Sequence, residues 1–156
     1  MKILMVTSET VPFAKTGGLA DAVSALAISM KKQGHDVRIV LPRYYKIDRS
    51  KLTKLEGPMG VAAGQTETWC AVYESKLPGS EVPVYFLDHE EAYGRDGIYG
   101  TKTETDFHDN PYRSALLCHG AFQLCRKLGW YPDVMHAHDW FAALVPVLLK
   151  CVCRNG

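Results

Sequence analysis

The sequence predicts an α/β fold with a mostly parallel sheet and helices on both of its faces. Short apolar runs of strand length alternate with longer segments in which apolar residues recur at helical spacing. The first apolar run is continuous rather than alternating, as in strands that are covered on both faces. The chain has 156 residues, about the length of one domain. We therefore predict a single domain over residues 1–156.

The first 41 residues predict a strand, a helix and a second strand. Residues 3–6 form the continuous apolar run, and residues 19–30 carry apolar side chains at helical spacing. Gly34 supplies a stop for this helix, and the β-rich run 37–41 ends at Pro42. Two parallel strands joined by a helix cross over in a right-handed sense, so the sheet is predicted to begin parallel.

The middle of the chain has a weaker pattern. Residues 44–80 are interrupted by breakers that include Gly57, Pro58, Gly60 and Gly64, and the alternation over 66–73 with the run 82–87 predicts a hairpin or edge strands. Residues 88–105 are polar, contain glycines and aromatics, and show no periodicity. They predict a long surface loop, a kind of segment that carries function more often than packing.

The last third predicts a helix, a strand and a helix. Asn110 is predicted to cap a helix that ends at Gly129, and residues 133–138 form a short strand. Residues 140–152 predict a final helix in which Pro146 causes a kink.

A doubly wound sheet normally continues from such a helix into another parallel strand. None follows in this sequence. We therefore expect the domain to be incomplete at its C-terminal end. We also expect an exposed sheet edge there, through which the chain could self-associate.

Charge and cysteine content exclude several classes of protein. Lys and Arg total 18 against 17 Asp and Glu, and this net charge of +1 gives no field that would attract nucleic acid or an anionic membrane. The five cysteines include no CxxC pair, which indicates reduced thiols and a cytoplasmic location. No run of about 18 apolar residues predicts a membrane span. The N-terminus is typical of a buried strand rather than a signal peptide.

The segment KTGGLAD, between the first strand and the first helix, predicts a phosphate site. Gly17 and Gly18 let a ligand approach the backbone, the helix beyond them offers unpaired N–H groups, and Lys15 adds a full charge. The alternative is that the glycines only turn the chain and that Lys15 is solvated, and the residues alone give both equal weight. The segment matches neither the dinucleotide nor the P-loop fingerprint.

The segment HAHDW lies at the C-terminal end of a predicted strand, the side where open α/β sheets bind ligands. His136 and His138 share a face of this strand. His138 is also a candidate substrate-binding residue. A metal site is conceivable, but few further ligands stand at suitable spacing, and a hydrogen-bonded core histidine is the alternative. Asp139 stands where a helix needs an N-cap, and simple capping is its alternative role.

Four segments resemble, in order and spacing, the N-terminus of bacterial glycogen synthases and plant starch synthases. They are KILMVTSETVPFAKTGGLADAVSALA, YGRDGIYG, DNPYRSALL and PDVMHAHDW. The resemblance covers nearly the whole chain. It implies the GT-B architecture, in which two Rossmann-like domains face each other across a cleft. Residues 1–156 would be the N-terminal, acceptor-side domain, with the second, nucleotide-binding domain absent.

The resemblance implies a retaining glucosyltransferase of glycogen or starch synthesis. Such an enzyme transfers glucose from ADP-glucose, or UDP-glucose, to the non-reducing end of an α-1,4-glucan, and it needs no metal or other cofactor. The chain alone is expected to be catalytically incomplete. Alternatives are a related GT-B glycosyltransferase with another acceptor and a non-catalytic glucan-binding or regulatory module.

The resemblance also implies a role for each candidate residue. Lys15, Gly17 and Gly18 would lie against the donor's diphosphate and sugar, Asp21 would line the donor pocket, Tyr99 would hold the glucan acceptor, and Asp139 would act at the transferred glucosyl unit. The sequence departs from the family at two places. Phe141 stands where many bacterial relatives have a histidine, and Ser114 follows the arginine where an aromatic residue is usual.

Overall fold

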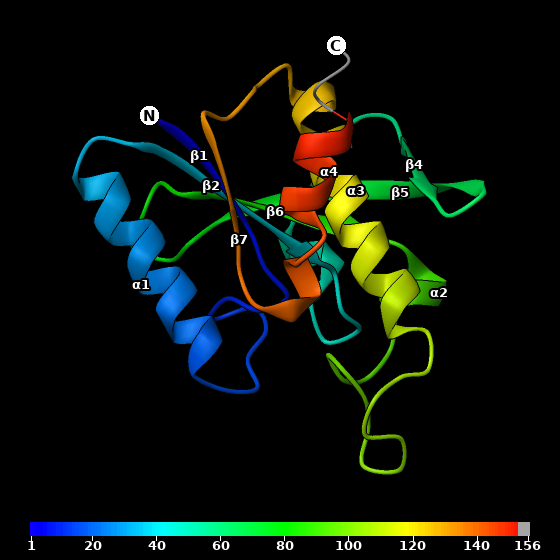
Figure 1. Cartoon of the computed structure of the whole chain (residues 1–156). Coiled ribbons are helices and arrows are strands. Elements are labelled where there is room, and N and C mark those ends of the chain that lie inside the picture. Colours follow the sequence, from blue (N-terminus) through cyan, green and yellow to red (C-terminus); the bar gives the residue numbers. More distant parts are fainter. Residues whose placement is uncertain (153–156) are drawn as a thin grey trace.

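The computed structural model describes residues 1–152, and within them seven strands form one sheet (Figure 1). The strands are β1 (Lys2–Val6), β2 (Asp36–Pro42), β3 (Thr53–Lys54), β4 (Met59–Ala63), β5 (Thr66–Lys76), β6 (Pro83–Asp88) and β7 (Val134–Ala137). Their order in the sheet is β3-β5-β6-β2-β1-β7, and β4 pairs with β5 outside this path. The four strands β6, β2, β1 and β7 run parallel, which confirms the predicted mostly parallel centre.

Helices cover both faces of this sheet, as predicted (Figure 1). They are α1 (Gly18–Lys32), α2 (Glu90–Tyr93), α3 (Asn110–Leu128) and α4 (Val145–Val152), with short 3-10 turns η1 (Arg49–Lys51) and η2 (Trp140–Ala142). The helix α1 packs on one face, and α3 and α4 pack on the other. The helix α1 joins the parallel pair β1 and β2, as predicted from the first 41 residues.

The predicted hairpin is present, but one of its strands is not at an edge. Strand β5 runs antiparallel to β6, while β6 pairs parallel with β2 through partners such as Ile39 and Val84. Both faces of β6 are buried, with Phe86 facing the side of α1 and Leu87 the side of α3. A continuous apolar run therefore belongs to an interior strand here, as it does in β1.

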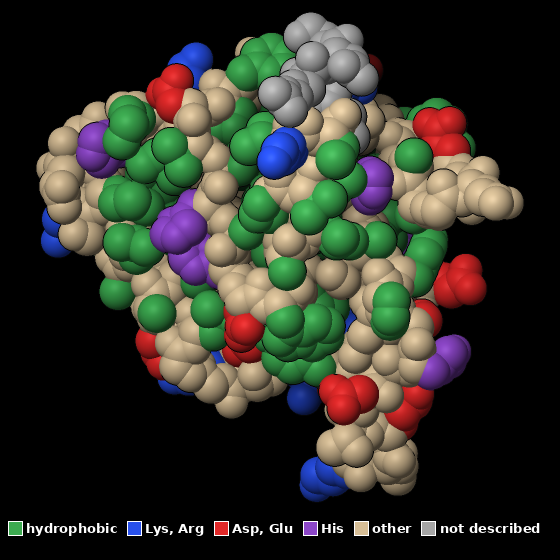
Figure 2. Space-filling view, in the orientation of Figure 1, with side chains coloured by type: hydrophobic (Ala, Val, Ile, Leu, Met, Phe, Trp, Pro, Cys, Tyr) green, Lys and Arg blue, Asp and Glu red, His purple; other side chains and the backbone are tan. Residues whose placement is uncertain are grey.

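Strand β7 pairs with β1 alone among residues 1–152. Hydrophobic side chains gather over β7 and α4 on the face shown in Figure 2. The large exposed ones in this region are Tyr131, Val134, Leu144, Val147 and Leu149. This edge is the one for which we predict self-association. No described helix is both long enough and apolar enough to cross a bilayer.

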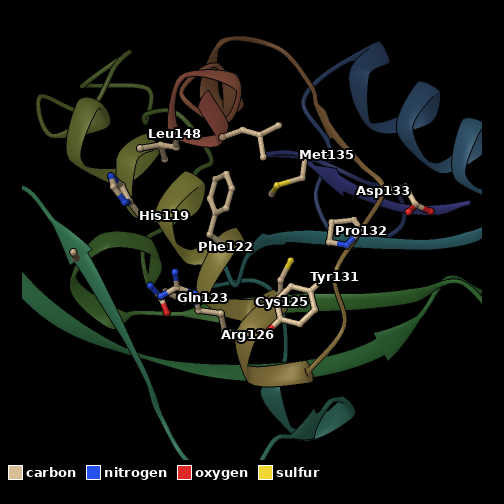
Figure 3. Close-up of a pocket in the computed structure, with 12 residues that line it drawn as sticks. His119, Phe122, Gln123, Cys125, Arg126, Tyr131, Pro132, Asp133, Met135 and Leu148 are labelled. Carbon is tan, nitrogen blue, oxygen red and sulfur yellow. The ribbon is translucent and has the colours of Figure 1, made fainter. Parts of the chain in front are cut away.

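A cavity of about 530 Å³ lies between α3, α4 and the segment that leads into β7 (Figure 3). Its walls are mainly apolar and include Phe122, Met135 and Leu148. The cavity lies at the amino end of β7, because Asp133 just before that strand also lines it. None of the seven site residues predicted from the sequence lines this cavity.

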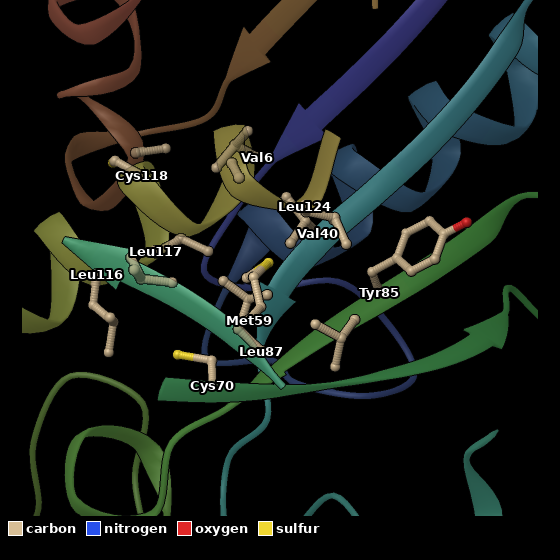
Figure 4. Packing of buried hydrophobic residues seen from close by; sticks show 14 of the residues in the cluster. Val6, Val40, Met59, Cys70, Tyr85, Leu87, Leu116, Leu117, Cys118 and Leu124 are labelled. Carbon is tan, nitrogen blue, oxygen red and sulfur yellow. The ribbon is translucent and has the colours of Figure 1, made fainter. Parts of the chain in front are cut away.

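Two hydrophobic cores sit on the two faces of the sheet. Successive residues of β1 alternate between them, with Ile3 and Met5 facing α1 and Leu4 and Val6 facing α3. Figure 4 shows the second core, where leucines of α3 pack against residues of the central strands. Gly120 lets α3 approach closely, because a Cβ atom there would lie 2.5 Å from a methyl group of Leu87.

The chain from residue 88 to 105 is not all loop. Residues 90–93 form α2, because Ala92 and Tyr93 are buried in the core and the Tyr93 hydroxyl donates to the Arg113 carbonyl over 2.6 Å. Four residues are too few to show a helical period in the sequence. Residues 94–109 form the surface loop, called the Tyr99 loop below, which projects from the body in Figure 1.

Arg113 of α3 holds the base of the Tyr99 loop. Its side chain is fully buried, and its guanidinium donates to the carbonyls of Ala92 and Ile98 over 2.6 and 2.8 Å and to Asn110 Oδ1 over 2.8 Å. The guanidinium also lies over the Phe107 ring, 4.9 Å from its centre. One cation thereby fixes both ends of the segment that carries Tyr99.

Two predictions about helix ends are wrong. Asn110 is the first residue of α3 rather than its cap, because Asp109 occupies the cap position and the Asn110 amide is used by Tyr99 and Arg113. The predicted helix over 140–152 is divided into η2 and α4. Pro146 is the second residue of α4, where a missing N–H breaks no helical bond, so it starts the helix rather than kinking it.

Other predicted features agree with the structure. Gly34 and Gly129 follow the ends of α1 and α3 with positive φ angles of 92° and 59°, which glycine adopts easily. Of the cysteines, Cys70, Cys118 and Cys125 are buried in the core. Cys153 lies outside the described residues.

Candidate functional site

The candidate site lies at the carboxyl ends of β1 and β7. The chain continues from β1 to β2 and β6 on one side, whereas β7 lies on the other side of β1, so the strand order changes direction between β1 and β7. Open α/β sheets bind ligands in the crevice at such a switch point. The KTGGLAD segment follows β1 and the HAHDW segment includes the end of β7. Both segments predicted from the sequence therefore lie at the same edge.

A polar run leaves the end of β1 and is almost completely buried. It comprises Thr7, Ser8, Glu9 and Thr10, none more than 2% exposed. Hydrogen bonds satisfy these side chains, as when Thr7 donates to the Glu9 carbonyl over 2.9 Å and Thr10 meets the Ser24 hydroxyl at 2.7 Å. Burial without such partners would be unfavourable. This run forms the floor behind the glycine segment.

Glu9 is the site residue that sequence reasoning missed. Its carboxylate accepts hydrogen bonds from the Thr16 backbone N–H over 2.6 Å, from the Thr16 hydroxyl over 2.9 Å and from the Tyr99 hydroxyl over 2.5 Å. The available signal was a glutamate three residues after the end of a buried parallel strand, at the edge where ligands bind. The partner Tyr99 is 90 residues away in the sequence, so no local pattern reveals the contact.

Lys15 and Asp21 form an ion pair over the start of α1. Lys15 Nζ lies 2.6 Å from Asp21 Oδ2, and the two side chains are 51% and 56% exposed. Asp21 belongs to the first turn of α1, where the helix dipole favours a negative charge. An exposed pair of this kind contributes about 0–1 kcal/mol, so an incoming anion can displace Asp21 from Lys15 easily.

The backbone conformation at positions 17 and 18 does not require glycine. Gly17, the N-cap of α1, has an extended φ of −163°, and neither glycine has a positive φ. A Cβ atom at either position would meet nothing within 4 Å. A turn that only glycine can adopt is therefore not the reason for these two residues. What they leave is open space in front of the first N–H groups of α1, which lack intrahelical partners.

His138 is half-buried beside His136. The two rings lie 4.1 Å apart on the predicted shared face of the strand, and histidines gather on the face shown in Figure 2. Burial, with a smaller contribution from His136, lowers the pKa of His138 to about 4, so its ring is neutral near pH 7. Its buried Nε2 has no hydrogen-bond partner within the described part of the chain. The alternative of a hydrogen-bonded core histidine is not what the structure shows.

The metal alternative for this segment finds no support in the described residues. Among residues 1–152, no group of three or more His, Cys, Asp or Glu side chains is placed to hold a metal ion.

Asp139 has the one positive φ angle found at a non-glycine residue among those described. Its φ of 62° and ψ of −176° fall in a region that is almost reserved for glycine and costs about 1–3 kcal/mol for other residues. The carboxylate accepts a hydrogen bond from the Trp140 N–H over 2.8 Å, so the predicted capping is present, at the start of η2. Glycine would suit this backbone better. Capping alone therefore does not explain an aspartate here.

Tyr99 joins the Tyr99 loop to both segments. Its hydroxyl lies 2.6 Å from the Ser8 hydroxyl and donates to Glu9, while its ring lies 5.6 Å from that of Trp140. Burial raises the pKa of Tyr99, and the hydrogen bond to Glu9 raises it further. The hydroxyl therefore remains protonated and keeps donating. Tyr99 lies between Glu9 at the end of β1 and Trp140 after β7.

The two departures from the family pattern contact each other. Phe141 is fully buried and packs against Tyr99, with ring centres 6.0 Å apart. The Ser114 hydroxyl donates to the Phe141 carbonyl over 2.8 Å. These residues thus support the site from within the core.

Comparisons with known proteins show which family the chain resembles. A family model described as the starch synthase catalytic domain matches residues 2–156. The chain is 62% identical over 155 residues to a glycogen synthase of Treponema denticola, covering 99% of this chain and 32% of that protein. It is 49% identical over 156 residues to glycogen synthase 1 of Geobacter metallireducens, covering 96% and 30%. The chain thus spans about a third of the length of these relatives.

A solved structure also matches the fold. The catalytic domain of starch synthase IV from Arabidopsis thaliana, bound to ADP and acarbose, superimposes with a TM-score of 0.85 at 25% identity. The match covers 99% of this chain and 31% of that one. It confirms the predicted fold, a mostly parallel sheet with flanking helices of the GT-B type.

The burial of His138 predicts a pH dependence of stability. Its pKa is about 4 in the fold against an ordinary 6.5, so between these values the unfolded chain binds a proton that the folded chain does not. The free energy of unfolding should therefore fall as the pH is lowered through this window. Relative to His138→Gln, which does not titrate, the loss should reach roughly 1–3 kcal/mol at about pH 4. Urea titrations of both proteins measure it, and a difference that does not change with pH would contradict this burial.

Proposed function

The chain belongs to the starch synthase catalytic domain family, and we propose that it forms the N-terminal, acceptor-side part of a retaining glucosyltransferase. The reaction would transfer glucose from ADP-glucose, or UDP-glucose, to the non-reducing end of an α-1,4-glucan. One observation carries this proposal. The glycine segment, the Tyr99 loop and Asp139 meet at the switch point of the sheet, although they are separated by up to about 120 residues of sequence.

The start of α1 would receive the donor's diphosphate. As the bond between glucose and diphosphate breaks, negative charge builds on the phosphate oxygens. Lys15 and the N-terminal dipole of α1 would stabilise that charge, and they would do so more strongly as the charge grows. The open space over Gly17 and Gly18 admits the phosphates to the helix N-terminus. Asp21 would yield Lys15 to the donor and line the donor pocket. We propose no metal, because Lys15 and the helix take the role of the cation.

Asp139 would act at the transferred glucosyl unit. The sugar develops positive charge as it separates from the diphosphate, and an ionised carboxylate close by would offset it. The strained backbone holds this carboxylate at the end of β7, where a strained residue is typical of a functional site. His138 is neutral near pH 7, so it adds no opposing positive charge, and its unpartnered Nε2 would hydrogen-bond the substrate.

Tyr99 would hold the glucan acceptor. Its hydroxyl is used by Ser8 and Glu9, so its ring is the part left for a ligand. Trp140, which is 48% exposed, extends this aromatic surface. Acceptor and donor would therefore meet over the polar run that follows β1.

The second wall of the cleft and the cellular location are also proposals. We propose that the nucleotide-binding domain of the family supplies the other wall, since the matched relatives are about three times as long as this chain.

We also propose a cytoplasmic location, in which buried thiols such as Cys70 and Cys118 remain reduced.

A hybrid enzyme tests this function. Residues 1–156 replace the matching segment of the Treponema denticola glycogen synthase, and incorporation of labelled glucose from ADP-glucose into glycogen is measured. We expect an active hybrid and at least tenfold less incorporation by residues 1–156 alone, because placing donor and acceptor together accounts for about 7–11 kcal/mol of the barrier. Equal incorporation by the short chain would contradict the proposed cleft. Glycogen co-sedimentation by an inactive hybrid would favour the non-catalytic binding module instead.

Lys15→Ala in the hybrid should lower kcat/KM for the donor about 30- to 1000-fold. This range corresponds to roughly 2–4 kcal/mol for one charge-assisted contact in the transition state. Lys76→Ala is the matched control, because Lys76 also lies 2.6 Å from a carboxylate, that of Glu81, and is 59% exposed. Steady-state kinetics should leave this control unchanged. Equal kinetics for both variants would reject the phosphate role of Lys15.

Asp139→Asn should lower kcat at least about 100-fold while the free energy of unfolding changes by less than about 1 kcal/mol. Asparagine caps a helix as well as aspartate and has nearly the same shape, so the backbone strain at this position stays the same, but it removes the charge. Asp48→Asn is the matched control, because Asp48 caps η1 through a hydrogen bond from the Ser50 N–H. Turnover and thermal unfolding of both variants are compared. Near-normal turnover by Asp139→Asn would leave capping as the role of Asp139.

A further inference from the structure

Glu9 carries a carboxylate that is buried without a cation. The residue is 2% exposed, and it forms no ion pair with a Lys, Arg or His side chain within residues 1–152. Burying a carboxylate in this way is unfavourable unless hydrogen bonds replace the lost water. Three donors do so here, two from Thr16 and one from Tyr99.

These donors come from two separate parts of the proposed site. Thr16 directly precedes Gly17, the N-cap of α1, so the contact to its N–H fixes the backbone where the diphosphate would bind. Tyr99 belongs to the loop that would hold the glucan. Oxygen Oε2 of Glu9 accepts from both the Thr16 hydroxyl and the Tyr99 hydroxyl. A single atom thus joins the donor side to the acceptor side.

The Tyr99 loop is otherwise attached at a distance from the glycine segment. Arg113 holds its base through the Ile98 carbonyl, and the Phe107 N–H donates to the Tyr99 carbonyl over 2.9 Å. Neither contact involves the glycine segment. The Ser8 hydroxyl is the other contact of the Tyr99 hydroxyl, and it lies next to Glu9 on the same buried run. Glu9 is therefore the residue through which Tyr99 and Thr16 are joined by side-chain hydrogen bonds.

We propose that Glu9 is a positioning residue that fixes the donor-binding glycine segment and the acceptor-binding Tyr99 loop relative to each other. The role rests on the proposed function for its meaning, since it assigns the two sides to donor and acceptor. Glu9 itself touches no reacting atom. It acts through Thr16 and Tyr99, so its loss would displace both substrates.

Three variants in the hybrid enzyme separate this role from general stabilisation. Glu9→Gln keeps the size of the side chain but removes the charge that three donors share. We expect it to raise KM for both ADP-glucose and glycogen about tenfold, the order of effect expected when a hydrogen bond to a charged group is lost. Thr16→Ala should raise mainly the donor KM, and Tyr99→Phe mainly the glucan KM.

Val37→Ala is the control for stability. Val37 is buried at the amino end of β2, where it pairs with Ile3, far from the carboxyl ends that hold the site. It should lower the unfolding temperature without changing either KM. The proposal is overturned if Glu9→Gln changes only one KM, if it changes neither by more than about twofold, or if Val37→Ala changes both to the same extent.

Amide hydrogen exchange in the 156-residue chain provides a readout without activity. The Thr16 N–H reports the glycine segment and the Phe107 N–H reports the Tyr99 loop. Glu9→Gln should accelerate exchange at both amides more than Val37→Ala does. An inactive unmodified hybrid would reject the proposed function, and exchange would still decide the positioning role. Unchanged exchange at both amides in Glu9→Gln would overturn it.

Discussion

The parallel pairing of β1 with both β2 and β7 is the constraint on which the rest of the structure depends. Parallel strands end at the same edge, so every loop that follows them starts there. The hydrogen bond from the His138 N–H to the Val6 carbonyl, 2.9 Å long, continues this pairing past the end of β7. It places Asp139 beside the polar run after β1. The two hydrophobic cores keep the strands in this register by burying both faces of β1.

Most of the fold was predictable because its signals are local. Continuous apolar runs indicated buried parallel strands, and helical spacing with glycine stops located α1 and α3 within one or two residues. The failures arise where tertiary contacts overrule local patterns. The four residues of α2 are helical because Tyr93 is buried against α3, and α4 starts late because Asp139 and Trp140 first form a separate turn. No period in the sequence encodes those contacts.

The candidate site was predictable in its parts but not in its connections. Lys15, Gly17, Gly18, Asp21, Tyr99, His138 and Asp139 were all named from sequence, and the structure places them around one edge. Glu9 was missed because its significance lies in a contact across 90 residues. The strain at Asp139 and the open space at Gly17 likewise appear only in three dimensions. Positions where a residue does not suit its local backbone conformation or packing are expected at functional sites.

The way the Tyr99 loop is anchored allows its tip to vary in length. The hydrogen bond from the Phe107 N–H to the Tyr99 carbonyl joins the two sides of the loop, and Arg113 binds the Ile98 carbonyl just before it. Between these two sides, residues 101–106 are all exposed and make no contribution to either core. Insertions or deletions there would leave Tyr99 in place, since loop closure becomes only slowly less favourable as length grows. The fold thus separates a fixed contact from an adjustable one, and the tip can change in length and sequence without loss of the Tyr99 contact.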